Sequence, residues 1–224
     1  MDTAMELEIA EASLLDTPDL VRVDCAAWKN NDIWRPLMLD AASSDEHNWL
    51  VREFGLRNSL PDRKAYKITD RAAGKLVTFT CLIIPYTLTA EQMSLLKDEH
   101  PPPQGHNSSL EAEFFELLQV AKKYGYDPKK DYHRKGTMVH PDYQRKGLGS
   151  WLTRYCNEVA DKTGRRTFVV ARPRSKHLFE SHGFRVLGSE DLDMTKYGGN
   201  ESEGKSWVLV REPHEVSDVE NRQE

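Results

Sequence analysis

The amino-acid sequence predicts a single α/β domain, of the α+β kind, with helices flanking a central, twisted, mixed and mostly antiparallel sheet. Two segments rich in β-branched and aromatic residues, 63–69 and 75–84, flank a short connection as the strands of a hairpin do. Later in the chain a strand, an amphipathic helix and a second strand follow one another, which is typical of a parallel crossover. Because no repeat or composition shift marks a second domain, we expect one domain over residues 1–211 and a flexible polar tail over 212–224.

The segment before the hairpin is expected to contribute one edge strand and two helices. Residues 7–10 alternate between apolar and polar, as a strand with one buried face does. Asp16 stands before Thr17 and Pro18, and this combination of a cap with an early proline starts a helix. A second polar group at 44–46 precedes another helical pattern. The residues expected to face the core from these two helices are Leu20, Val23, Ala27, Trp28, Trp49, Leu50 and Phe54.

A long insertion, residues 85–131, is expected between the third and fourth strands. Three consecutive prolines at 101–103 break regular structure. Ser108 and Glu111 have the spacing of a capping box, so a helix is expected to begin there and to end before Gly125. We expect its apolar face to pack in the core, and the alternative is that it shapes a substrate pocket. That face consists of Leu110, Phe114, Leu117, Leu118 and Ala121.

The second half of the chain alternates strands and helices. An amphipathic helix over 148–160 presents Leu152 and Cys156 on one face and stops near Gly164. Because a hairpin comes first and a crossover follows, the sheet should be mixed. The remaining elements are expected at 135–140, 166–171, 184–187 and 207–211 as strands, and at 175–181 as a short helix.

The composition disfavours several classes of protein. A formal net charge of −5 disfavours nucleic-acid binding, which depends on lysine and arginine meeting phosphates, and mildly suits a cationic substrate. No segment approaches the roughly 20 apolar residues that a bilayer requires, and the acidic start does not resemble a secretion signal. We therefore expect a cytoplasmic protein with no membrane or nucleic-acid partner. The three cysteines lack CxxC spacing and the histidines lack metal-ligand spacing, so we expect no disulfide framework and no metal.

The most informative segment is 137–150, where a strand ends and a basic, glycine-containing loop leads directly into a helix. Such a junction directs several free backbone N–H groups, and the positive end of the helix dipole, at one point outside the strand. Gly147 and Gly149 would let a diphosphate approach the backbone closely, while Arg145 and Lys146 add positive charge. The segment therefore predicts a diphosphate-binding site.

Two common phosphate-binding loops do not fit this spacing. A Walker loop requires Gly-Lys followed by Ser or Thr, whereas Lys146 precedes Gly147 in this chain. A dinucleotide-binding fingerprint requires a third glycine where this chain has Leu152. The remaining alternative is a basic turn at an exposed helix start, with no ligand.

Residues 144–149 read Gln-x-x-Gly-x-Gly and resemble the Gln/Arg-x-x-Gly-x-Gly/Ala motif of the GCN5-related N-acetyltransferases (GNATs), with Val-x-Pro before it at 139–141 as in many of those proteins. Residues 178–184, Leu-Phe-Glu-Ser-His-Gly-Phe, resemble their second signature, Leu-Tyr-Glu-x-x-Gly-Phe. Two motifs in the right order, separated by a helix and a strand, make the resemblance specific. The order of elements agrees over about 7–211, whereas the sequence signal is confined to 137–184.

The resemblance implies a sheet splayed between its fourth and fifth strands, with the pantetheine arm of acetyl-CoA in the gap. It also implies that the acceptor attacks the thioester directly in a ternary complex, so that the protein supplies positioning, proton removal and oxyanion stabilisation. The residues it assigns to the cofactor are Met138 and Val139 on the strand, Gln144, Arg145, Lys146, Gly147, Leu148, Gly149 and Ser150 in the loop, and Phe179 on the later helix.

Phe179 departs from the family pattern. Many members have a tyrosine at this position, where its hydroxyl can protonate the departing thiolate. A CoA thiol leaves tolerably well without help, because its acidity is close to that of free cysteine. The substitution therefore weakens this mechanism without refuting catalysis. Tyr155, Ser181 and His182 are conceivable substitutes for the acid.

For the catalytic base, the resemblance points to His133. Some family members that act on arylalkylamines have two histidines two residues apart on this strand; His133 matches the first, and Lys135 replaces the second. An ordinary histidine pKa near 6.5 suits proton transfer at neutral pH. The alternative is a solvated histidine at a strand end, and His140 is expected to be structural.

These observations predict an acetyl-CoA-dependent N-acetyltransferase that acts on an amine, in the first place that of a small molecule. Protein amino groups and a hydroxyl acceptor are narrower alternatives. A domain that binds acyl-CoA without turnover is an alternative of another class, and Phe179 keeps it open. The segments expected to face the acceptor, 28–35, 86–126 and 196–205, follow no pattern that identifies it, and nothing in the sequence reveals the oligomeric state.

Overall fold

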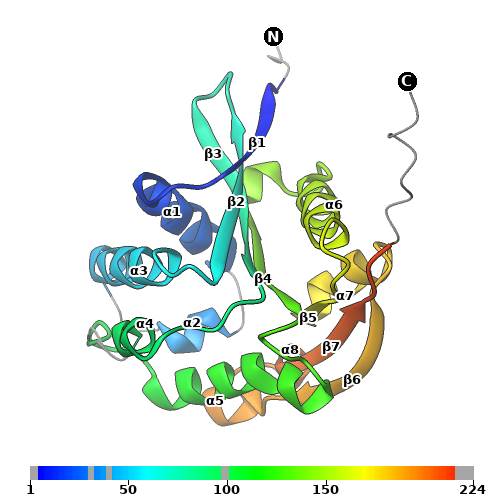
Figure 1. Ribbon diagram of the computed structural model, residues 1–224. Helices are drawn as coiled ribbons and strands as arrows, with labels where there is room; N and C mark the ends of the chain where they lie inside the picture. The colour runs from blue at the N-terminus through cyan, green and yellow to red at the C-terminus, as the bar shows by residue number, and fades with distance from the viewer. Residues whose placement is uncertain (1–4, 30–32, 39–41, 97–100, 215–224) are drawn as a thin grey trace, which may run out of the picture.

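The computed structural model describes residues 5–29, 33–38, 42–96 and 101–214, and these contain one seven-stranded sheet with the strand order β1-β2-β3-β4-β5-β7-β6 (Figure 1). Neighbouring strands are antiparallel except for β4 and β5, which are parallel. The sheet is therefore mixed and mostly antiparallel, as predicted. The strands are β1 (Leu7–Glu11), β2 (Arg63–Asp70), β3 (Lys75–Ile83), β4 (Tyr132–Val139), β5 (Thr167–Ala171), β6 (Arg185–Asp191) and β7 (Lys205–Arg211).

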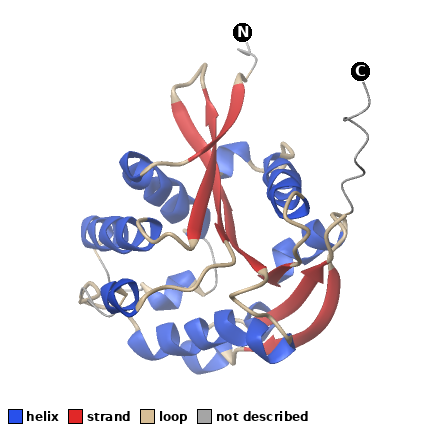
Figure 2. Cartoon of the chain, in the orientation of Figure 1, coloured by secondary structure: helices blue, strands red, loops and turns tan. Residues whose placement is uncertain are grey.

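Helices flank the sheet on both faces (Figure 2). On one face Leu20 of α1 belongs to the same buried cluster as Phe79 of β3, and on the other Leu152 of α6 packs in a cluster with Val77 of β3. The apolar spacing of the α6 sequence produces this packing, because residues three and four apart share one side of a helix. The helices are α1 (Thr17–Trp28), α2 (Trp34–Leu37), α3 (Ser43–Asn58), α4 (Ala90–Leu95), α5 (Ser108–Gln119), α6 (Leu148–Asp161), α7 (Pro173–Glu180) and α8 (Glu201–Gly204).

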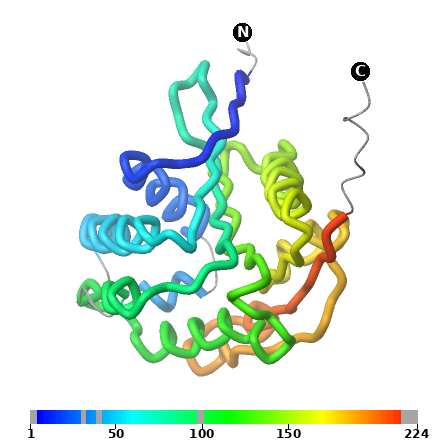
Figure 3. The backbone as a smooth tube through the Cα atoms, viewed as in Figure 1, coloured from blue at the N-terminus to red at the C-terminus, as the bar shows by residue number. Residues whose placement is uncertain are grey.

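The segment between β3 and β4 carries α4, α5 and the 3-10 turn η2 (Val120–Tyr124). It runs along the lower edge of the molecule, from the side of α1 and α3 to the side of β5 and β7 (Figure 3). The side chain of Asn107 accepts a hydrogen bond from the Leu110 N–H at 3.0 Å and caps α5. The capping box predicted for Ser108 and Glu111 is therefore wrong by one residue, since asparagine is itself a strong N-cap.

Other differences from the predicted elements concern their ends and the shortest helices. β4 begins three residues before its predicted start, and α7 begins two residues before its own. The sequence did not predict α2, α4 or α8, because helices of four to six residues are too short to show a period. Parts of the predicted tail 212–224 and of the acceptor-facing segments 28–35 and 86–126 lie outside the described residues. None of the described helices is both long and apolar enough to cross a membrane.

Candidate functional site

β4 and β5 separate soon after they begin. They pair in parallel only through Tyr132, His133 and Arg134 of β4, whereas β4 stays paired with β3 as far as Val139. The edge of β4 that faces β5 is therefore released beyond Arg134. This agrees with the splay between the fourth and fifth strands that the family resemblance implies.

A β-bulge lies where the two strands part. Pairing with β3 moves from Leu82 opposite Arg134 to Thr80 opposite Thr137, so β4 holds one residue more than β3 in this interval. Bulges bend a strand, increase its twist and redirect its side chains, and they are common beside active sites. The bulge accounts for the divergence of β4 from β5.

The hydrogen bonds of β4 show which peptide groups face the gap. The Met138 carbonyl accepts a bond of 2.6 Å from the Thr78 hydroxyl, and the His140 N–H donates to the Val77 carbonyl at 2.9 Å, so these groups point toward β3. Peptide groups alternate between the two edges of a strand. Val139 therefore presents its N–H and C=O to the open edge, whereas the predicted partner Met138 does not. The second residue with that orientation is Thr137.

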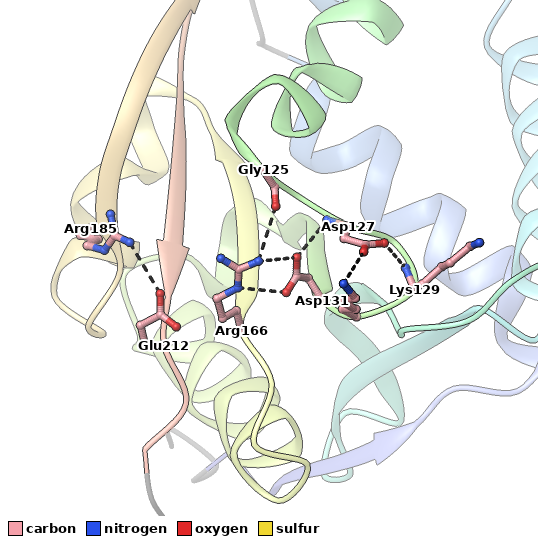
Figure 4. Close-up of polar contacts among 8 residues, drawn as sticks. Gly125, Asp127, Lys129, Asp131, Arg166, Arg185 and Glu212 are labelled. Atoms are coloured by element: carbon pink, nitrogen blue, oxygen red, sulfur yellow. Dashed lines mark hydrogen bonds and ion pairs between the residues drawn. The ribbon is translucent and has the colours of Figure 1, made fainter.

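An ion pair between a buried carboxylate and a partly exposed arginine side chain holds together the closed end of the splay (Figure 4). Asp131, which precedes β4, accepts hydrogen bonds from Arg166, which precedes β5, at 3.1 Å from Nε and 2.9 Å from Nη2. The Asp131 side chain is 3% exposed and also accepts from the Asp127 N–H at 2.9 Å. A two-pronged contact of this kind fixes geometry as well as charge, and it holds the beginnings of the two strands together.

The predicted diphosphate loop follows β4 after one 3-10 turn, η3 (Pro141–Tyr143). Arg145 has a φ of 63° and is the one non-glycine residue with positive φ in the described ranges, while Gly147 has a φ of 79°. Left-handed residues in such a turn direct successive backbone N–H groups inward and form an anion-binding nest. The side chains of Gln144, Arg145 and Lys146 are exposed.

The nest leads directly into the N-terminus of α6. Gly147 is the N-cap and offers no side-chain cap, and the Trp151 N–H donates to the Gly147 carbonyl at 3.0 Å. The preceding N–H groups, those of Leu148, Gly149 and Ser150, have no partner within the helix. They point out of the positive end of the helix dipole, at which an anion is stabilised.

Gly149 brings this helix end close to α7. A Cβ atom at Gly149 would stand 3.4 Å from Cδ2 of Leu178. Glycine at this position therefore serves packing between helices as well as access to the backbone. The two motifs seen in the sequence, 144–149 and 178–184, consequently meet in space.

A cavity of about 790 Å³ extends away from the splay, a size typical of small-molecule sites. Residues 133–136 and Met138 of β4, with Val170 of β5, line it at the sheet. α1, α3 and α5 form its outer wall, so the helix in the long insertion contributes to the pocket as well as to the core.

Asp24 of α1 lies in the outer wall, and the sequence analysis did not identify it as a site residue. The residue is 4% exposed, and burial raises the pKa of its carboxyl to about 7, with a further contribution from the charge of Glu46. The Trp28 indole N–H donates to Asp24 at 3.1 Å. The available sequence signal was an acid four residues after Leu20 and four before Trp28, on the apolar face of a helix.

His133, the predicted base, also lines the cavity but is 4% exposed. Its ring lies 4.9 Å from that of Tyr126, and its Nε2 has no hydrogen-bond partner among the described residues. Burial, and to a lesser degree the charge of Lys135, lowers the pKa of His133 well below 6.5. The ring is therefore neutral at pH 7 and a weak proton acceptor. Burial also lowers the pKa of Lys135, to about 8.

Phe179 is 3% exposed and packs with Phe184 at 5.3 Å between ring centres, in a cluster that includes Val169 and Leu209. It is not among the described residues that line the cavity. The same holds for the three residues considered as substitutes for its missing hydroxyl, Tyr155, Ser181 and His182. The cofactor role of Phe179 remains a prediction.

Comparisons with known proteins agree with this geometry. Residues 116–186 match the family model described as an acetyltransferase (GNAT) domain. No curated protein matches the chain in sequence.

Many solved structures share the fold. The C-terminal condensation domain of Ebony, in complex with β-alanyl-dopamine, has a TM-score of 0.65 and 12% identity, with 93% of this chain and 99% of that one covered. An insect protein assigned as arylalkylamine N-acetyltransferase 7, from the yellow fever mosquito, has a TM-score of 0.63 and 13% identity, with 92% and 87% covered. A histone acetyltransferase HPA2-related protein from Corynebacterium glutamicum has a TM-score of 0.60 and 14% identity, with 95% and 99% covered. Residues 116–186 are therefore similar to the acetyltransferase (GNAT) domain model, and the described residues share the fold of these solved structures.

Proposed function

We propose that this protein is an acetyl-CoA-dependent N-acetyltransferase that transfers an acetyl group to the amine of a small molecule, by direct attack in a ternary complex. One observation carries the proposal: the released edge of β4 leads into a nest of left-handed residues that opens on the N-terminus of α6. The junction offers an extended hydrogen-bonding edge and an anion site in succession. A pantetheine diphosphate presents the matching groups in the same order.

In this proposal the cosubstrate is held entirely by backbone and loop. The N–H groups of residues 145–150 bind the diphosphate, and Arg145 and Lys146 supply positive charge. The peptide groups of Thr137 and Val139 bind the pantetheine amides, and this replaces the contact predicted for Met138. The Val139 carbonyl can accept a second hydrogen bond beside the one from Gln144, because a carbonyl oxygen has two lone pairs.

Acetyl-CoA supplies the activated acetyl group, and the protein positions the acceptor amine relative to it. The acceptor amine occupies the cavity, which residues of β4 line at the sheet. Such orientation contributes a large part of the rate in reactions between two bound substrates. The departing thiol needs little acid assistance, so a phenylalanine at position 179 is compatible with turnover.

Two of the structures that share the fold support a small amine. One holds β-alanyl-dopamine, and another is assigned to arylalkylamine acetylation. The volume of the cavity, about 790 Å³, is also typical of small-molecule sites. The second candidate function, acyl-CoA binding without turnover, is favoured by the absence of a hydroxyl at Phe179.

The experiment compares binding with turnover on the same protein. Calorimetry measures the affinity for CoA, and a thiol assay measures CoA release from acetyl-CoA with a panel of amines, corrected for the rate without amine. Amine-dependent release supports the transferase. Thermal stabilisation by CoA without any amine-dependent release supports the binding domain. Absence of CoA binding would contradict both.

A further inference from the structure

Three carboxylates from the described residues line the cavity, and one of them, Asp24, takes part in no ion pair with another described residue. Glu53 pairs with Arg57 at 3.0 Å, and Glu111 lies 3.5 Å from His106. None of the ion pairs in the described part of the chain includes Asp24, although Asp24 is the most buried of the three. An ionised carboxylate in such a place is costly unless it is paired. The missing partner points to a cationic ligand.

Aromatic rings stand beside this carboxylate. Trp28, one helical turn after Asp24, lies edge-on to Phe114 of α5 at 6.4 Å and 5.7 Å from Trp34. Trp28 and Phe114 both line the cavity. A flat apolar group would gain contact area against these rings, and the indole face would also attract a neighbouring ammonium group.

The carboxylate lies toward the part of the sheet where transfer is proposed. Leu20 and Val23 of α1 belong to a buried cluster against which Met138 of β4 packs, and Asp24 follows directly on the helix. α1 therefore carries Asp24 toward the released end of β4. Asp24 and Met138 line the same cavity, so an ammonium group held by Asp24 lies in the space that the released part of β4 borders.

The sheet end of the cavity is cationic. Arg63 of β2 and Lys135 of β4 line it there, and burial, with the charges of Arg63 and of Arg57 on α3, lowers the pKa of Lys135. A second positive charge on the acceptor would meet repulsion there. The cavity thus favours one ammonium group joined to an apolar ring, and disfavours a polyamine.

We propose that the acceptor is an arylalkylamine with a single primary amino group, and that Asp24 binds this group and acts as the catalytic base. This rests on the proposed function. The Asp24 carboxylate accepts one proton from the ammonium group, and the freed lone pair attacks the thioester carbonyl carbon. A C–N bond forms and the C–S bond breaks. The amide nitrogen releases its surplus proton and the CoA thiolate gains one, so the products are an N-acetyl amine and CoA thiol.

The test uses two substitutions on α1 that remove the same charge. Asp24→Asn preserves shape and can still accept the Trp28 hydrogen bond, whereas Asp19→Asn removes a carboxylate that is 58% exposed on the same helix. With 2-phenylethylamine, Asp24→Asn should lower kcat/KM by about 10²–10⁴-fold with CoA affinity unchanged, and Asp19→Asn should stay within about twofold of the wild type. His133→Gln serves as a further comparison and should lower kcat less than Asp24→Asn does.

Matched acceptors test the substrate class. The wild type should turn over 2-phenylethylamine at least about tenfold better than butylamine or spermidine, and Trp28→Leu should lower kcat/KM by a larger factor for 2-phenylethylamine than for butylamine. Each of three results would overturn the proposal: preference for spermidine, full activity in Asp24→Asn, or loss of activity in His133→Gln alone.

Calorimetry with 2-phenylethylamine distinguishes failure of the amine site at Asp24 from failure of the proposed function. If the wild type binds 2-phenylethylamine without turnover and Asp24→Asn does not bind it, the transferase is refuted but the amine site is retained. If the wild type and Asp24→Asn bind 2-phenylethylamine equally well, the amine site is refuted.

Discussion

The side-chain amide of Gln144 donates a hydrogen bond to the carbonyl oxygen of Val139 over 3.1 Å. The first residue of the proposed diphosphate loop is thereby bonded to the last residue of β4. Anion site and strand edge consequently have a defined relative position, which a ligand that contacts both requires. The predictions below begin with this junction.

Gly147→Val should weaken CoA binding by at least about tenfold, because the side chain would strain a left-handed residue and obstruct the nest. Gly164→Val is the matched control. Gly164 has a φ of 62°, and a Cβ atom at either glycine meets nothing within 4 Å. Both substitutions should lower the free energy of unfolding by about 1–2 kcal/mol, measured by chemical denaturation. Equal CoA affinities in the two variants, measured by calorimetry, would show that the loop does not bind the cosubstrate.

Asp24→Asn should change how stability depends on pH. Because the pKa of Asp24 is raised from 3.8 to about 7, the folded protein retains a proton that the unfolded chain loses between these values. The wild type therefore loses stability as pH rises through this window, and asparagine, which does not titrate, avoids the loss. The variant should gain on the order of 3 kcal/mol relative to the wild type between pH 4 and pH 8.

Denaturant titrations of both proteins at pH 4, 6 and 8 measure this difference, since the other ionisable groups are common to the two. A gap between the curves that stays constant with pH would show that the Asp24 carboxyl titrates in its ordinary range. The expected result would mean that the buried Asp24 carboxyl lowers the stability of the folded protein at neutral pH.

Phe179→Tyr should lower the free energy of unfolding by about 1–3 kcal/mol without raising turnover, because the added hydroxyl would enter an apolar cluster. Phe184→Tyr, in the partner ring of the same cluster, should cost a similar amount. The measurements are denaturation curves and kcat with a productive amine. A clear rise in kcat in Phe179→Tyr alone would instead place the ring edge at the thioester, as the resemblance implies for the tyrosine of the GNATs.

Asp131→Asn should destabilise the fold by about 1.5–3 kcal/mol, because it breaks the charged hydrogen bonds from Arg166 that fasten β4 to β5. Glu212→Gln is the control in the same region, since Glu212 and Arg185 are both exposed and lie 3.6 Å apart (Figure 4). That change should stay within about 0.5 kcal/mol. Similar denaturation midpoints for the two variants would show that the pair of Asp131 and Arg166 does not close the splay.

Local patterns in the sequence were sufficient for the order of the strands and the longer helices and for the anion loop. The hairpin of β2 and β3 followed from β-branched segments around a short turn, and α6 followed from its apolar spacing. The loop at 144–149 was recognisable because backbone freedom and charge are properties of neighbouring residues. These features depend on contacts of short range, which the sequence shows directly.

Only the tertiary structure decided the chemistry of the cavity. Asp24 and His133 are distant in the chain, and burial raises the pKa of the first and lowers the pKa of the second. The sequence pointed to His133 as the base, on a resemblance, and carried no such signal for Asp24. A pKa depends on desolvation and on charges brought close by folding, and a strand's free edge depends on where its neighbour diverges. Neither the pKa nor the free strand edge is determined by residues adjacent in sequence, so neither could be predicted without the packed fold.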